Sequence, residues 1–199
     1  ENINNLLNLI QKNSKSNNND VVLIDWSTYS QDTLKASFDG ERVGRNVASR
    51  IVSSLEQQYK RIHVIGVSVG AFPAHAFIQH TRKVEEKESR DDNNNRRYIQ
   101  LTLLDPFQLK GALSTKYGLN NFGIGADYAQ HFLNTDDPVP ATNAPLTNHC
   151  ACIDITSLRP TELFGHDWPL VYYTQQYENK IGSFVPADEQ KEKGSLLVL

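Results

Sequence analysis

The chain passes from a predicted strand to a predicted helix through Ile62-His63-Val64-Ile65-Gly66-Val67-Ser68-Val69-Gly70-Ala71. The apolar run over 62–67 is typical of a strand buried on both faces. Residues 69–80 are rich in small side chains and predict a helix, with Pro73 in the first turn, where proline is tolerated. A serine in Gly-x-Ser-x-Gly at such a junction occupies a sharp, strained turn, and small neighbours prevent clashes there. We therefore expect the hydroxyl to stand above the edge of a sheet, near the positive end of the helix.

The same alternation of strands and helices extends over most of the chain. Further apolar runs predict strands over 21–26, 98–104 and 127–134, and a short one near Ile153. Apolar side chains at helical spacing predict a helix near the amino terminus (Ile3, Leu6, Leu7, Ile10), one through Val43, Val47, Ile51 and Leu55, and a last one over 166–177. Alternation of this kind predicts the α/β class, with a mostly parallel sheet and helices on both faces.

Four segments are predicted to lack regular structure. They are an Asn- and Ser-rich loop over 13–19, a charge-dense insertion over 83–97, a glycine-rich stretch over 107–126 and a weakly held tail. The expected organisation is one domain over 1–185, followed by a tail over 186–199.

Composition narrows the possible functions. The 199 residues include 20 Lys and Arg against 23 Asp and Glu, for a net charge of −3, which argues against a nucleic-acid binder that depends on bulk positive charge. No apolar run approaches the roughly 20 residues of a membrane span. Cys150 and Cys152 are too close for an unstrained bridge. The chain begins at Glu1 and lacks methionine, which predicts removal of a preceding segment and favours a secreted or organellar protein.

A serine becomes an effective nucleophile when a base and an acid assist it. Asp105 ends the strand over 98–104, and His166 follows the last predicted strand. Ser68, Asp105 and His166 therefore follow one another in the order nucleophile, acid, base at predicted strand ends. Simpler interpretations are that Asp105 caps the turn before Pro106 and that His166 caps a helix.

Other residues offer competing interpretations. Asp137 follows the strand over 127–134 and is a second candidate acid for His166. We expect His63, His75 and His131 to be structural, because they lie within predicted strands or a core-facing helix. The run His149-Cys150-Ala151-Cys152 lacks the second half that a zinc site requires, so we predict no metal and no cofactor. Four apolar side chains would suit the mouth of an acyl site, although packing in the core is the simpler interpretation of them: Phe107, Leu109, Phe122 and Trp168.

Four motifs together resemble the pancreatic lipase group of the α/β-hydrolases. They are Val22-Leu23-Ile24-Asp25-Trp26, the serine turn, Leu103-Leu104-Asp105-Pro106, and Thr135-Asp136 followed by Ala144-Pro145. The resemblance covers about 21–173 and implies an α/β-hydrolase fold whose early strands would precede Glu1. It also implies that Asp105 is the acid, whereas fungal-type lipases would place it at Asp137, and that the Val69 amide forms part of an oxyanion hole.

The resemblance implies a serine hydrolase acting on carboxylic esters, with lipid esters as the expected substrates. It also implies peripheral contact with membranes. The alternative is a catalytically inactive lipase-like fold that serves as an interaction subunit of a larger assembly. Val67, at a position where the group usually has histidine, favours that alternative.

Overall fold

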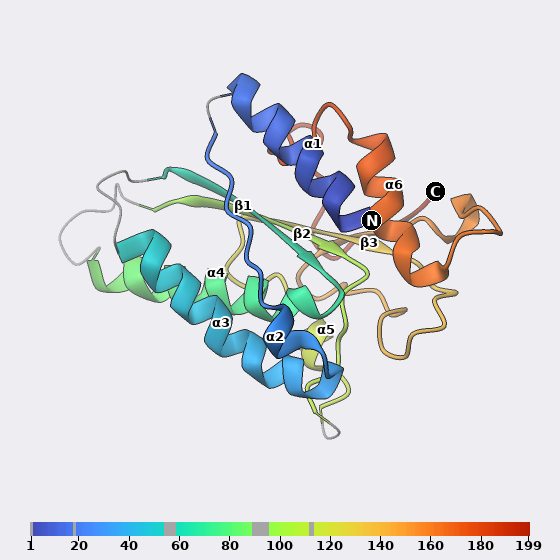
Figure 1. Cartoon of the computed structure of the whole chain (residues 1–199), viewed down its shortest axis with the longest axis horizontal. Helices are drawn as coiled ribbons and strands as arrows, with labels where there is room; N and C mark the ends of the chain where they lie inside the picture. The colour runs from blue at the N-terminus through green and yellow to red at the C-terminus, as the bar shows by residue number, and fades with distance from the viewer. Residues whose placement is uncertain (1, 18, 54–58, 89–95, 112–113) are drawn as a thin grey trace.

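The computed structural model describes residues 2–17, 19–53, 59–88, 96–111 and 114–199. It has three layers, with a twisted sheet in the middle and helices on both faces (Figure 1). Helices α3 and α4 lie on one face of the sheet, and α1 and α6 lie on the other. The part of the chain that the structure describes contains no helix both long enough and apolar enough to cross a bilayer.

The sheet has five strands in the order β1-β2-β3-β4-β5, and all neighbouring pairs are parallel. This confirms the predicted α/β class. The strand bounds are Arg61–Val67 (β1), Tyr98–Leu104 (β2), Tyr128–Leu133 (β3), Ala151–Asp154 (β4) and Leu196–Val198 (β5). Because the strands are parallel, their carboxyl ends meet at one edge, where Val67, Leu104 and Leu133 each end a strand.

The helices connect and cover these strands. The chain leaves β1 directly into the short 3-10 helix η1 (Ser68–Gly70) and then α4 (Ala71–Glu88), which returns it to β2. The 3-10 helix η3 (Gly165–Asp167) comes just before α6, between β4 and β5. The other helices are α1 (Asn2–Asn17), α2 (Ser27–Ser30), α3 (Thr33–Ser53), α5 (Tyr117–Asn121), η2 (Thr156–Leu158) and α6 (Trp168–Gln176).

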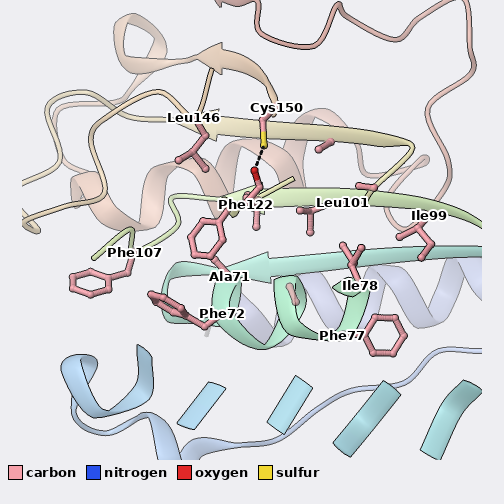
Figure 2. Close-up of a cluster of buried hydrophobic side chains, with 14 of the residues drawn as sticks. Ala71, Phe72, Phe77, Ile78, Ile99, Leu101, Phe107, Phe122, Leu146 and Cys150 are labelled. Carbon is pink, nitrogen blue, oxygen red and sulfur yellow. Dashed lines mark hydrogen bonds between the residues drawn. The ribbon is translucent and has the colours of Figure 1, made fainter. Parts of the chain in front are cut away.

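One apolar core fills the space between the sheet and helices α3 and α4. Side chains of alternate β2 residues, Ile99, Leu101 and Leu103, meet Phe72 and Ile78 of α4, and all five are fully buried. Figure 2 shows these contacts together with the Cys150 thiol, which points to the carbonyl oxygen of Phe122 at 3.7 Å. The small residues Ala71, Ala74 and Ala76 of α4 are buried.

A second core lies on the opposite face of the sheet. It joins Leu104 and Phe132 of the sheet to Trp168 and Tyr173 of α6 and to Leu6 of α1. The indole N–H of Trp168 donates to the carbonyl oxygen of Ile155 at 2.8 Å, which fixes the start of α6. Because η3 directly precedes Trp168, this packing also fixes the position of His166.

The prediction of a strand over 21–26 is wrong. This segment forms no regular structure, and the side chains of Val22 and Leu23 are 61% and 60% exposed. It lines one side of an apolar groove whose other side includes Ile62 and Val64 of β1. Although β1 is an edge strand, the segment does not pair with it or with another strand among the described residues.

Three predicted loops also differ from the structure. Helix α1 continues to Asn17, through most of the segment predicted as a loop over 13–19, and α4 continues to Glu88. Residues 89–95 of the predicted insertion lie outside the described residues. Leu55 of the predicted helix also lies outside them. The tail is not loose, because Leu196–Val198 pairs with β4 and the Leu199 amide donates to the Asp154 carbonyl oxygen at 2.9 Å.

We predict that Leu101→Ala lowers the free energy of unfolding by about 2–5 kcal/mol, because Leu101 is fully buried and its truncation leaves a cavity. The matched control is Leu23→Ala, which removes an exposed side chain and should change stability by no more than about 0.5 kcal/mol. Chemical denaturation of both variants measures the difference. Equal losses would show that the segment over 21–26 is packed in solution.

Candidate active site

Ser68 lies at the corner between β1 and the helix that follows it. Its φ angle is 51°, in the left-handed region that a non-glycine residue rarely occupies. A Cβ atom on Gly66 would lie 3.1 Å from both the Gly70 carbonyl oxygen and a methyl carbon of Leu103, so a larger residue would crowd this corner. The predicted strained turn is therefore present at Ser68.

Gly70 does not have the steric role that its place in the motif suggests. A Cβ atom added there would meet no heavy atom within 4 Å. The predicted clash is thus real at Gly66 and wrong at Gly70.

His166 stands beside the serine. Its Nε2 lies 2.9 Å from Ser68 Oγ, although the two residues are 98 positions apart in the sequence. The imidazole is partly accessible, with 20% of its side chain exposed, and Ser68 is only half-buried. A small reagent therefore has access to this pair.

Two carboxylates meet the other ring nitrogen of His166. Asp105 Oδ2 lies 2.6 Å from His166 Nδ1, and Asp137 Oδ2 lies 2.9 Å from the same atom. Asp105 follows β2 with a φ angle of 47°, and Asp137 lies in the turn after β3. The structure thus brings together all three predicted residues and also the rival acid.

The two carboxylates have different hydrogen-bonding environments. The Asp137 carboxylate accepts a hydrogen bond from the backbone N–H of Val139 at 3.0 Å and another from the Thr142 hydroxyl. Asp105 Oδ1 is buried and has no hydrogen-bond partner. The ordinary sequence signals for an active site point to neither Thr142 nor the Val139 amide, because their role depends on how the turn folds back on Asp137.

These environments shift the pKa values of the two carboxyl groups in opposite directions. Burial raises the pKa of Asp105 to about 7, and the proximity of Asp137 adds to this effect. Burial opposes ionisation of Asp137 too, but hydrogen bonds with Asp105, Thr142 and the Val139 amide outweigh it and hold the pKa of Asp137 below its ordinary value. Burial disfavours the charged form of His166, but the two carboxylates outweigh it and raise its pKa.

Three other histidines, His63, His75 and His131, are buried or half-buried within the fold. His63 Nε2 lies 2.9 Å from Thr102 Oγ1, and Nδ1 lies 3.1 Å from the Gly182 carbonyl oxygen. Burial lowers the pKa of His63 to about 4 and that of His131 to about 3, so both are neutral at physiological pH. His75 is buried, and its ring lies against the rings of Tyr117 and Phe122. These contacts agree with their predicted structural role.

The four apolar side chains considered for an acyl mouth follow the simpler interpretation, packing in the core. Phe107, Phe122 and Trp168 are at most 7% exposed and belong to the two cores, and Leu109 packs at the margin of one of them. Phe107, Phe122 and Trp168 therefore belong to the packed interior and do not line an accessible mouth.

A metal ion would have one place to bind among the described residues. Ligand atoms of Asp105, Asp137 and His166 lie within 4.8 Å of one another. His166 Nδ1 is already within hydrogen-bond distance of both carboxylates, so the contacts are accounted for without an ion. Cys150 and Cys152 are buried free thiols.

We predict that Gly66→Val lowers the free energy of unfolding by about 1–3 kcal/mol, because its side chain overpacks the corner. Gly70→Ala is the matched variant and should raise stability by about 0.4–1 kcal/mol, because alanine fits and restricts the unfolded chain. Thermal or chemical denaturation distinguishes the two. A larger loss for Gly70→Ala than for Gly66→Val would contradict the steric account.

Comparison with known proteins assigns the chain to no family. No protein-family profile, no curated protein and no solved structure matches it. The functional interpretation therefore depends on the geometry of Ser68, His166 and the two carboxylates.

Proposed function

We propose that the protein is a serine hydrolase of the α/β-hydrolase fold that cleaves carboxylic esters. The observation that carries the proposal is the chain of contacts from Ser68 Oγ through His166 to two buried carboxylates. This is the arrangement in which a histidine activates a serine while an acid orients the ring. The strained φ of Ser68 adds support, since such strain gathers at functional sites.

In the proposed reaction, Ser68 Oγ attacks the ester carbonyl carbon and His166 Nε2 accepts the hydroxyl proton. The carbonyl oxygen becomes an oxyanion near the amide of Val69, the second residue of η1, since the first N–H groups of a helix have no acceptor within the helix. The intermediate then collapses, and His166 returns the proton to the departing alcohol. Water, activated by the same imidazole, hydrolyses the acyl-enzyme and regenerates Ser68.

Lipid esters are the proposed substrates, and they come from the resemblance to the pancreatic lipase group. One feature of the surface is compatible with them: Phe164, two residues before His166, is 54% exposed. The alternative of an inactive interaction subunit has less support, because it would be favoured by a His166 ring remote from Ser68, and the two are in contact.

We predict that a fluorophosphonate probe labels the protein and that Ser68→Ala lowers the labelling rate by at least about 10³-fold. Ser49→Ala is a matched control, because Ser49 Oγ also lies 2.9 Å from a histidine nitrogen, that of His80. Ser49 lies within α3, and its hydroxyl donates to the Arg45 carbonyl oxygen at 3.0 Å, so its proton is engaged. Gel fluorescence and peptide mapping follow the adduct.

Ser49→Ala should be labelled as fast as the parent protein. Equal labelling of the parent protein and Ser68→Ala would remove Ser68 from the proposed mechanism.

A further inference from the structure

We propose that Asp105 and Asp137 form an acid pair that shares one proton, with the negative charge on Asp137 and the proton on Asp105. Asp137 is then the charged group that orients His166, and Asp105 is a neutral carboxylic acid in the resting site. This deepens the proposed function and reverses the assignment that the lipase resemblance implies, in which Asp105 is the ionised acid.

The first argument is a count of protons. Three atoms, His166 Nδ1 and one oxygen from each carboxylate, converge within 4.8 Å. The imidazole has a single N–H at Nδ1, so it can donate one full hydrogen bond, to one of the two carboxylate oxygens. Two ionised carboxylates this close repel one another, and a second proton between them relieves the repulsion.

The second argument concerns which acid keeps the proton. Asp137 hydrogen-bonds the Val139 amide and the Thr142 hydroxyl, and such hydrogen bonds favour the ionised form. Asp105 is 1% exposed, and its Oδ1 has no partner at all. A negative charge on Asp105 would therefore have the His166 ring as its one ion-pair partner, and the unpartnered Oδ1 would leave part of that buried charge uncompensated, which is costly. The raised pKa of Asp105, about 7, agrees with this assignment.

The third argument concerns the charges around the pair. In the ion pairs of the described residues, His166 is the one partner of Asp105 and of Asp137. The nearest other acids along the chain are Asp136, which pairs with Arg159 at 2.7 Å, and Asp167, which follows His166. Arg159 is thus paired with Asp136, and in the part of the chain that the structure describes no lysine or arginine forms an ion pair with Asp105 or Asp137.

The pair has a consequence for catalysis. When His166 accepts the serine proton, the ring carries a charge of +1. An acid pair that holds one proton carries −1, so the imidazole and the two carboxyl groups together are neutral. Two ionised carboxylates would instead leave net negative charge in the same buried space, at a higher cost. Asp137 is therefore a positioning residue that acts through His166, and Asp105 sets the charge of the pair.

The experiment compares Asp105→Asn, Asp137→Asn and the double variant, with Asp136→Asn as control. Fluorophosphonate labelling rates are measured from about pH 5 to about pH 9. Asn resembles a protonated acid, so Asp105→Asn should slow labelling by no more than about tenfold at neutral pH. Asp137→Asn should cost about 10³-fold near pH 6 and recover as pH rises, because Asp105 then loses its proton and takes over the charge. The double variant should lose about 10⁴-fold at every pH.

Asp136 is exposed and lies outside the pair, so Asp136→Asn should label like the parent protein. A 10⁴-fold loss in Asp105→Asn, with Asp137→Asn nearly as fast as the parent, would overturn the proposal. If the Asn variants fail to fold, Thr142→Val provides a milder test, because it removes a hydroxyl that stabilises the charge on Asp137. It should slow labelling about tenfold, and Thr142→Ser should restore the rate.

Infrared spectroscopy tests the shared proton without using the reaction. The carbonyl stretch of a protonated carboxylic acid should be present near neutral pH in the Ser68→Ala protein. It should disappear in Ser68→Ala/Asp105→Asn and persist in Ser68→Ala/Asp136→Asn. If the band is absent from Ser68→Ala, the acid pair is overturned even when the parent protein is labelled by the fluorophosphonate. If the band is present but the parent protein is not labelled, only the proposed hydrolase activity is overturned.

Discussion

The contact between Ser68 Oγ and His166 Nε2, at 2.9 Å, joins two parts of the chain that are 98 residues apart. It depends on two features that are separate in sequence. The first is the positive φ at Ser68, which turns the hydroxyl out of the β1–η1 corner. The second is the packing of Trp168 against the second core, which holds η3 and its histidine. Loss of either feature would separate nucleophile from base and leave only the fold.

Parallel topology explains why the acids arrive at the same place. Strands β1, β2 and β3 are neighbours and run in one direction, so the residues that follow them emerge at a common edge. Ser68 follows β1, Asp105 follows β2 and Asp137 lies in the turn after β3. A fold of this kind offers more than one position from which an acid can reach a histidine. Here Asp105 and Asp137 occupy two such positions.

Much of the fold could be predicted from sequence because its signals are local. The apolar runs at β2 and β3 specify those strands to within one residue, and the small residues of α4 locate the start of that helix to within two residues, although it continues to Glu88. The segment over 21–26 has an equally strong apolar pattern, but a strand needs a pairing partner, and pattern alone does not report one. The reverse holds for Leu196–Val198, which looks like a tail and becomes a strand because β4 offers its edge.

The site residues also divide into those that a local sequence signal predicts and those whose role depends on the tertiary structure. Ser68, Asp105 and His166 could be found because each follows a recognisable element in the expected order. Sequence could not establish that Asp105 and Asp137 both reach His166, since that depends on distances of 2.6 Å and 2.9 Å set by the turn after β3. For Phe107 and Trp168 the sequence favoured the core without establishing it, because an apolar side chain near a site has the same pattern whether it faces the core or a ligand.

The most direct test of the account is a crystal structure of the protein after reaction with a phosphonate ester. We expect continuous density from Ser68 Oγ to phosphorus, the phosphonyl oxygen near the Val69 amide, and the His166 ring still in contact with both carboxylates. Phosphorus bonded to another residue, or an unmodified Ser68 with the His166 ring turned away from it, would contradict the account.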